Sequence, residues 1–443
     1  MALRLHVALV SGKEVSLEAS PEWTLGQLKR RAQQALGTNV ELLEKRAAGL
    51  RAGSSLAEMG FQDDEVLSAV VRSPNIVSNK CKMQVVKSPA SAFALIRSDG
   101  SVVTWGGLGV PVPEGLAEVQ EMAATRAAFA ALRADGTVVS WGDPEEGGSE
   151  SVQHLVEVSS LVSTSRAFAA IVGPDARVEA WGAPGSGGCC AEVQDQLHRV
   201  TLLASTDAAF AALTEDGSVV TWGFAPFGGT SPPEAQSKGA PVLEIIGNGC
   251  AFAARRDDGT VLTWGVADRG GEVPEETKEK LRDVTQLAAT YFGFCAVRSD
   301  GTVVTWGGFG KLGGSIPDSL RGVVSVVGSA SALCARLCDG RAVVWGEGPA
   351  ATVSEGLQEQ LISVQQICAG RDAFAVVRAD GRLISWGNTG AQELEGVTRV
   401  FSSPGAFAAV MNAGEVLCWG AAEHGGVPDA TAQEALRNAF RKC

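Results

Sequence analysis

A tryptophan followed by a glycine recurs nine times along this 443-residue chain, at intervals of 33 to 42 residues. In most copies a phenylalanine stands twelve residues before the tryptophan, and a glycine stands five residues before it. Leu333 replaces the phenylalanine once, Phe168 lies one residue further away, and Ala176 replaces one glycine. Positions kept at these offsets over nine copies indicate a repeat protein. The tryptophans expected to form the structural core of the repeats are Trp105, Trp141, Trp181, Trp222, Trp264, Trp306, Trp345, Trp386 and Trp419.

Each copy is expected to contain a β-hairpin. In the second copy, two apolar runs at 128–132 and 137–141 are joined by Asp135-Gly136. Asp-Gly tolerates the positive φ values of a type I′ turn, which makes it a strong hairpin signal. A third apolar run precedes the phenylalanine in most copies, for example at 284–290. Because a small sheet alone is only marginally stable in water, we expect three strands per copy, packed against the sheets of neighbouring copies.

The connectors between Trp-Gly and the next strand vary in length and often contain Gly-Gly. Variable loops on a constant scaffold usually carry binding, so we expect a protein partner to contact them. Residues 308–313 fit the pattern GxGxxG but lack the helix of a dinucleotide site, so they are interpreted as a connector. The acidic run 143–146 lacks the ligand alternation of a calcium loop and is interpreted as a solvated connector.

The net charge of −13 is unevenly distributed. Residues 1–73 carry equal numbers of basic and acidic side chains, so the excess of acids belongs to the repeats. An acidic body argues against binding to a phosphate backbone, and no nucleic acid is expected. No run is long and apolar enough for a membrane helix, and Arg4 and His6 interrupt the N-terminal apolar stretch. The chain is expected to be cytoplasmic, with the nucleus as a second compartment and no membrane partner.

Residues that could carry chemistry are sparse. The four histidines have no repeated acidic or nucleophilic partner, and neither Cys189-Cys190 nor the Cys334/Cys338 pair has convincing zinc spacing. We therefore expect a non-enzyme without cofactor or metal. Five further positions are expected to be buried free thiols on strands, namely Cys250, Cys295, Cys334, Cys368 and Cys418.

The N-terminal 73 residues follow a different plan. Alternating apolar residues at 3–10 and 14–18 flank a turn and predict a hairpin. Thr24 can cap a following helix whose buried face would carry Leu28, and Gly37 would end it. A short strand at 41–46 and a final strand at 66–72 complete a ββαββ order.

The segments 11–18, 24–29, 48–49, 55–62 and 67–72 resemble a ubiquitin-like β-grasp domain over residues 1–73. This resemblance implies a link to ubiquitin-pathway or proteasome proteins. It also implies that Ala47 and Val70 stand where the family's apolar protein-binding patch lies. The chain continues through Arg72-Ser73-Pro74. It therefore lacks the Gly-Gly end that conjugation requires, which implies an integral domain.

The pattern Phe…Asp-Gly-x-Val-x-x-Trp-Gly…Gly-Gly resembles the regulator of chromosome condensation repeat superfamily, which includes a β-lactamase-inhibitory propeller with three-stranded blades. The resemblance implies a mostly β fold, a β-propeller of about nine three-stranded blades after a small α+β domain. The family's usual histidine before the turn is absent, and nine copies exceed its usual seven. An open array is the alternative.

The sequence thus predicts a β-grasp domain at 1–73, a linker at 74–81, nine repeats at 82–428 and a C-terminal helix at 429–443. Thr431 and Glu434 would form a capping box for that helix. Two binding modules favour a non-catalytic scaffold or adaptor, in which the repeats bind a protein partner and the first domain links it to ubiquitin or proteasome machinery. The alternatives are a guanine-nucleotide exchange regulator of a small GTPase and a stand-alone binder or enzyme inhibitor.

Overall fold

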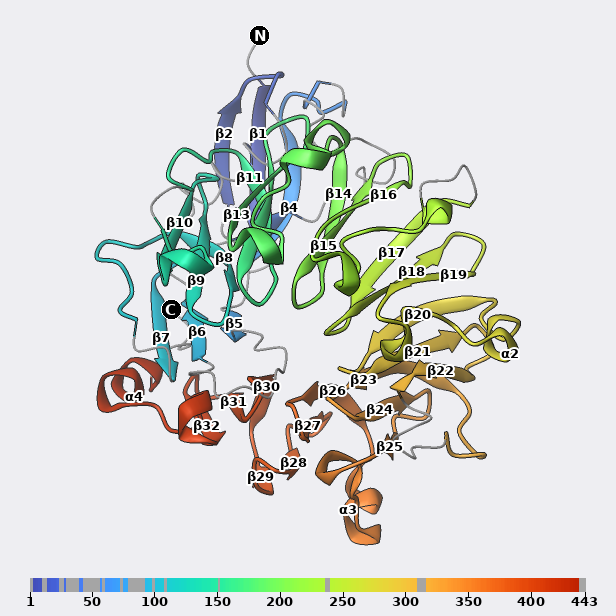
Figure 1. Ribbon diagram of the computed structural model, residues 1–443. Helices are drawn as coiled ribbons and strands as arrows, with labels where there is room; N and C mark the ends of the chain where they lie inside the picture. Colours follow the sequence, from blue (N-terminus) through green and yellow to red (C-terminus); the bar gives the residue numbers. More distant parts are fainter. Residues whose placement is uncertain are drawn as a thin grey trace.

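The computed structural model describes residues 3–9, 14–23, 28, 40–42, 56–57, 60–71, 75–78, 92–97, 100–106, 110–149, 152–235, 240–308 and 316–437. These residues form a mixed four-stranded sheet followed by nine antiparallel sheets in chain order. Figure 1 shows the nine sheets succeeding one another around a common centre. The protein is therefore mostly β, and the prediction of three strands per copy is confirmed.

The N-terminal sheet has the strand order β2-β1-β4-β3. Its two central strands, β1 and β4, run parallel, whereas β2 and β3 pair antiparallel with them. The predicted helix lies outside the described residues apart from Leu28, which is buried in the small core beneath the sheet. The strands span Leu3–Leu9 (β1), Glu14–Ala19 (β2), Val40–Leu42 (β3) and Glu65–Val71 (β4).

The first of the nine sheets begins earlier than the sequence indicated. Strand β5 (Asn75–Ser78) pairs antiparallel with β6 (Ala92–Ile96), and β6 pairs with β7 (Val102–Gly106). The segment expected to be a linker thus supplies a strand, because its central Ile-Val pair has high β propensity despite polar neighbours. The repeats were expected to begin at residue 82, and residues 79–91 lie outside the described residues.

The other eight sheets repeat this plan, and among the described residues only the eighth of the nine sheets in chain order has a fourth strand. Sheets two to four comprise β8 (Val119–Ala124), β9 (Ala128–Arg133), β10 (Val138–Gly142), β11 (Val158–Ser163), β12 (Ala167–Val172), β13 (Arg177–Gly182), β14 (Val200–Ser205), β15 (Ala209–Thr214) and β16 (Val219–Gly223). Sheets five to seven comprise β17 (Val242–Gly247), β18 (Ala251–Arg256), β19 (Val261–Gly265), β20 (Val284–Ala289), β21 (Gly293–Arg298), β22 (Val303–Gly307), β23 (Val323–Gly328), β24 (Ala332–Leu337) and β25 (Ala342–Gly346). Sheets eight and nine comprise β26 (Val364–Ala369), β27 (Ala373–Arg378), β28 (Leu383–Gly387), β29 (Gln392–Leu394), β30 (Val397–Ser402), β31 (Ala406–Met411) and β32 (Val416–Gly420).

The described helices are short, and all but the C-terminal α4 lie in the connectors. No helix of the described residues is long and apolar enough to cross a membrane. The described helices are η1 (Pro144–Glu146), η3 (Pro184–Ser186), η4 (Ala191–Gln196), η5 (Ala225–Phe227), η6 (Pro233–Ala235), η7 (Ala267–Arg269), α2 (Glu275–Lys278), η9 (Pro349–Ala351), α3 (Glu355–Gln360), η10 (Ala422–His424) and α4 (Ala430–Leu436).

The Asp-Gly turns differ from the predicted type I′ geometry. In the second sheet the Gly136 N–H donates to the Arg133 carbonyl at 3.0 Å, and Gly136 alone in this turn has a positive φ, at 83°. This is a type I turn followed by a left-handed glycine, one of the common hairpin solutions. Asp135 favours it because its carboxylate accepts from the Thr137 N–H at 2.9 Å.

The middle strand of each sheet is buried on both faces. In β12, Ala167 and Ala169 pack toward the fourth sheet, whereas Phe168 and Ala170 pack toward the second. This alternation follows from the two-residue period of a strand. Alanine at three of these four positions allows neighbouring sheets to approach closely.

The repeated tryptophans and Gly-Gly pairs join one sheet to the next. Phe210 stacks on Trp222 with ring centroids 5.2 Å apart, and the Trp222 Nε1–H donates to the carbonyl of Gly187 in the preceding connector at 3.0 Å. A Cβ on Gly187 would lie 2.6 Å from the Phe210 ring. A Cβ on Gly188 would lie 2.4 Å from the Gly182 carbonyl oxygen. Both glycines of the pair are therefore required by close packing.

The same contact joins the ninth sheet to the first. The Trp105 Nε1–H donates to the Gly425 carbonyl at 3.0 Å, and Phe93 packs in one core cluster with Ala408 and Val410 of β31. Figure 1 places β5–β7 beside β30–β32. Nine apolar clusters thus occupy the nine boundaries between successive sheets, including this one, within the described residues.

The C-terminal helix α4 begins earlier than the predicted capping box. Asp429 is its N-cap, and its carboxylate accepts from the Ala432 N–H at 2.8 Å. Thr431 therefore lies inside the helix, and the capping-box prediction is wrong, because an aspartate two residues upstream competes for the same role. Ala432 and Leu436 pack into the cluster between the ninth and first sheets.

The contact between the ninth and first sheets is tested by Gly425→Ala. Gly425 has φ of 86°, and a Cβ there would lie 2.6 Å from the Phe93 ring. Left-handed strain and overpacking together should cost about 2 kcal/mol or more. We expect Gly425→Ala to lower the urea and thermal unfolding midpoints as much as Gly270→Ala, which makes the equivalent contact with Phe294.

Gly185→Ala is the matched control, because a Cβ at Gly185 meets no atom within 4 Å. This variant should unfold like the original protein. If Gly270→Ala lowered the unfolding midpoints and Gly425→Ala left them unchanged, the contact between the ninth and first sheets would be contradicted.

Candidate protein-binding groove

The connectors are anchored by a polar contact that recurs around the ring. The Thr164 hydroxyl accepts from the Ala167 N–H at 3.0 Å and donates to the Ser186 carbonyl at 3.0 Å. Thr206 makes the same bond to the Phe227 carbonyl at 3.0 Å. Because a buried hydroxyl requires hydrogen-bond partners, each contact fixes the start of a connector against the turn between the first two strands. Thr125, Asn248 and Ser403 take the equivalent role.

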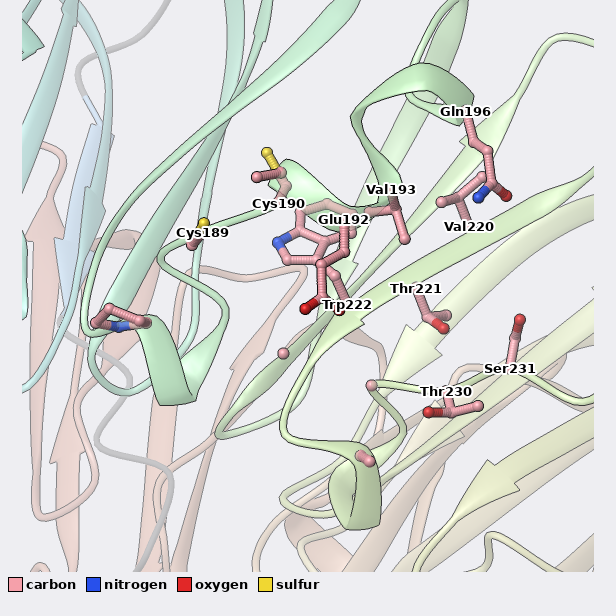
Figure 2. A pocket seen from close by; sticks show the side chains of 15 residues that line it. Cys189, Cys190, Glu192, Val193, Gln196, Val220, Thr221, Trp222, Thr230 and Ser231 are labelled. Atoms are coloured by element: carbon pink, nitrogen blue, oxygen red, sulfur yellow. The ribbon is translucent and has the colours of Figure 1, made fainter.

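The connectors of the third and fourth sheets border a groove of about 590 Å³. Figure 2 shows Glu192 and Val193 on the helical turn η4 at one side, Thr230 and Ser231 on the other, and Thr221 of β16 between them. The groove therefore lies along the outer strand of the fourth sheet.

Cys190 and Gln194 attach η4 to the third sheet. The Gln194 Nε2–H donates to the Val178 carbonyl at 3.1 Å, and the Cys190 Sγ lies 3.0 Å from the Gln194 Oε1. Burial, with a smaller contribution from the charge of Glu179, raises the pKa of Cys190 to about 11. Cys190 is therefore a protonated donor, and η4 forms a fixed wall of the groove.

A second hollow of about 460 Å³ continues along β16 and shares Gln196 and Val220 with the first. Its acidic residues are Asp195, Glu215 and Asp216, and its basic residues are His198 and Arg199. Hydrogen bonds from the Thr214 hydroxyl at 2.6 Å and the Ser218 N–H at 3.1 Å lower the pKa of Asp216. This end of the groove therefore remains acidic.

The acidic run 143–146 differs from the solvated connector predicted for it. Glu146 is buried, and its Oε1 accepts from Arg166 Nε at 3.0 Å and from Arg126 at 3.2 Å. Arg126 and Arg166 belong to the turns of the second and third sheets. The carboxylate thus ties two sheets together, which a sequence pattern confined to one connector does not reveal.

Tyr291, the only tyrosine of the chain, forms a second contact across sheets. Its hydroxyl lies 3.1 Å from the Asp207 carboxylate of the fourth sheet. A Cβ on Gly249, in the turn between them, would lie 2.5 Å from the tyrosine ring. Burial and the Asp207 charge raise the pKa of Tyr291, so the hydroxyl stays protonated and serves as a donor.

The described cysteines are all free thiols. Cys295 and Cys334 are fully buried on strands, and burial raises the pKa of Cys368 to about 11 and of Cys418 to about 12. The prediction of a strand position is wrong for Cys250, which lies in the turn between β17 and β18. The described residues hold no group of three or more His, Cys, Asp or Glu placed for a metal.

The residues predicted to bind protein are only partly placed. Ala47 lies outside the described residues, and Val70 pairs with Glu41 between β4 and β3. The nine tryptophans are all buried, each on the third strand of its sheet. The GxGxxG run falls almost wholly outside the described residues.

The groove residues were not predicted from the sequence, where only the expectation of binding through the connectors pointed to this region. Thr221 occupies a position where Thr104, Thr263 and Thr305 also stand, so its residue type carries no distinguishing signal. The one sequence feature that could have indicated the groove is the length of the connector that contains η4.

Comparisons with known proteins give no functional assignment. No protein-family model matches the sequence, and no curated protein matches it. The WD40 ectodomain of the receptor kinase ACR4 from Arabidopsis thaliana is 16% identical, with 68% of this chain and 92% of that chain covered and a TM-score of 0.38. Prp20p from Saccharomyces cerevisiae is 17% identical, with 76% and 82% covered and a TM-score of 0.35.

The computationally designed protein Ika8 is 16% identical, with 69% of this chain and 96% of that chain covered and a TM-score of 0.38. These TM-scores are too low for the likeness to carry an argument. The fold and the groove therefore rest on the strand pairing and contacts described above.

Thiol labelling tests the burial of the cysteines. Alkylating reagents attack thiolates, and a pKa of about 11 leaves Cys190 protonated at about pH 7.5. We expect iodoacetamide and mass spectrometry to find the exposed Cys189 and Cys338 modified first. Cys190, Cys295 and Cys334 should react only after unfolding in urea. Rapid labelling of Cys295 in the folded protein would contradict this packing.

Glu146→Gln tests the contact between the second and third sheets. A neutral amide cannot compensate the charges of Arg126 and Arg166, so we expect the free energy of unfolding to fall by about 1–3 kcal/mol. The measurement is urea denaturation. Glu145→Gln is the control, because Glu145 is exposed and its change should stay within about 0.5 kcal/mol. Equal effects of the two variants would rule out this role of Glu146.

Proposed function

We propose that this protein is a non-catalytic adaptor. The ring of sheets binds a protein partner through its connectors, and the N-terminal sheet is a ubiquitin-like domain that links this partner to ubiquitin or proteasome machinery. The observation that carries the proposal is the order and direction of the strands in the N-terminal sheet.

This strand topology supports a β-grasp domain. The first hairpin, β1 and β2, lies beside β4, and the last strand β4 runs parallel to the first strand β1 in the centre. A parallel central pair requires a crossover connection. The predicted helix between β2 and β3 would supply it. Resemblance at residues 55–62 and 67–72 favours the same fold.

The ring supports the other half of the proposal. Its nine sheets and nine boundary clusters favour a closed nine-bladed propeller, the form that the comparison of Gly425→Ala with Gly270→Ala tests. A closed ring holds its connectors in constant positions. The groove between the third and fourth sheets then becomes a preorganised binding surface.

Affinity capture from the source cell extract tests the adaptor function. Full-length protein, a variant lacking residues 1–73 and the variant Val70→Ala are compared by mass spectrometry. We expect full-length protein to capture proteasome or ubiquitin-pathway proteins. The deletion should abolish this capture, and Val70→Ala should weaken it, because truncation at a binding patch commonly costs more than about 1 kcal/mol.

Val324→Ala is the matched control, because Val324 is an exposed valine on strand β23, outside both the N-terminal sheet and the connectors. It should capture the same proteins as the full-length chain. Identical partners with and without residues 1–73, none of them from the ubiquitin pathway, would reject the adaptor and leave the ring as the binding module.

A further inference from the structure

We infer that the groove along β16 binds a short extended segment of a partner protein that carries a lysine or arginine side chain. The inference rests on the proposed function, since it names the kind of segment that the ring would bind. Three observations support it, namely the continuity of the groove, a threonine hydroxyl in the groove that has no hydrogen-bond partner among the described residues, and an excess of acidic side chains.

The groove is long enough for a peptide backbone. Its two hollows, of about 590 and 460 Å³, share Gln196 and Val220 and together follow β16 from Ser218 to Gly223. The wall formed by η4 is held by the Gln194 bond to Val178. A segment bound there would lie beside an existing strand rather than in a round cavity.

The Thr221 hydroxyl is the polar group that points to a backbone ligand. Thr221 is 7% exposed and lines the groove, and no described residue forms a hydrogen bond with its hydroxyl. Figure 2 shows this side chain between the two walls. The hydroxyl oxygen is accessible from the groove. A bound segment would offer it a hydrogen-bond partner in place of water.

Two other sheets show what such a hydroxyl binds at this position. Ser140, which precedes Trp141 as Thr221 precedes Trp222, donates to the Ser149 carbonyl at 2.6 Å. Ser385 in the eighth sheet accepts from the Gln392 N–H at 3.1 Å and lies 3.3 Å from the Gly390 carbonyl. In both sheets the partner is the backbone of a segment that follows the third strand. Thr221 is therefore placed to bind a backbone in the same way.

The charges select a basic side chain on that segment. The groove carries four acidic residues, Glu192, Asp195, Glu215 and Asp216, against the two basic residues His198 and Arg199. Within the described part of the chain, neither Glu192 nor Asp195 forms an ion pair. In the eighth sheet the charges are reversed. There the added strand β29 carries the acidic residue, Glu393, and it pairs with the basic residue Arg382 beside β28. An acidic groove favours a cationic ligand by the same complementarity.

Peptide selection tests the inference directly. The full-length protein selects binders from a displayed library of random linear peptides, and the selected peptides are synthesised and titrated by fluorescence anisotropy. We expect the selected peptides to share a lysine or arginine. Their affinity should fall about fivefold or more in Thr221→Val, which loses one hydrogen bond, and in Asp195→Asn, which loses one charge.

The matched controls are Thr263→Val, at the equivalent position of the fifth sheet, and Asp318→Asn on a distant exposed loop. Both should bind as the original protein does. Asp195 is exposed, so its variant keeps the test valid if Thr221→Val fails to fold. A failure to select any peptide, selected peptides without a shared basic residue, or unchanged affinity in Thr221→Val and Asp195→Asn would overturn the inference.

This result is separable from the adaptor test. Peptides that bind as expected, together with capture that does not depend on residues 1–73, would reject only the ubiquitin link. Capture that depends on residues 1–73, together with failed peptide selection, would reject only the groove.

Discussion

The contact between a stacked Phe-Trp pair and the Gly-Gly of the preceding connector is the interaction that joins five of the nine neighbouring pairs of sheets. Each tryptophan removes about 150–250 Å² from water, worth roughly 4–6 kcal/mol at about 25 cal/mol per Å² as an upper bound. A buried indole N–H also needs a partner, and in five of the nine sheets a glycine carbonyl of the preceding connector supplies it, as Gly187 does for Trp222. One side chain thus stabilises its own sheet and orients the neighbouring one. Because Trp105 makes this bond to Gly425, the same geometry that joins successive sheets also joins the last sheet to the first.

A scaffold built in this way separates stability from recognition. The strands are constrained on both faces, so substitutions there act on packing. Several connectors are anchored near their start, where a hydroxyl such as that of Thr164 holds the backbone. Beyond that point their length and residues vary, and a groove arises where two neighbouring connectors leave the third strand uncovered. The groove along β16 is a consequence of this arrangement, and its acidic end adds selectivity without changing the sheet beneath it.

Much of the fold was predictable because its signals are local. The offset between phenylalanine and tryptophan specifies a hairpin, and nine copies specify its repetition. The type of turn was not predictable, because Asp-Gly suits both type I′ and a type I turn with a left-handed glycine. The burial of Glu146 was missed because its two arginine partners come from different sheets. The groove was missed for a similar reason: Thr221 shares its repeat position with other threonines, and only the surrounding connectors distinguish it.

The sequence by itself determined the strands, their grouping in threes, the buried aromatic positions and the need for glycine in the connectors. These properties follow from residue types at short spacings, where backbone geometry leaves few alternatives. Only the tertiary structure decided that the ninth sheet meets the first, that residues 75–78 form a strand, and that η4 stands beside β16 to form a groove. Such contacts join residues far apart in the chain, and they depend on the summed twist and spacing of all the sheets between them, which no local pattern records.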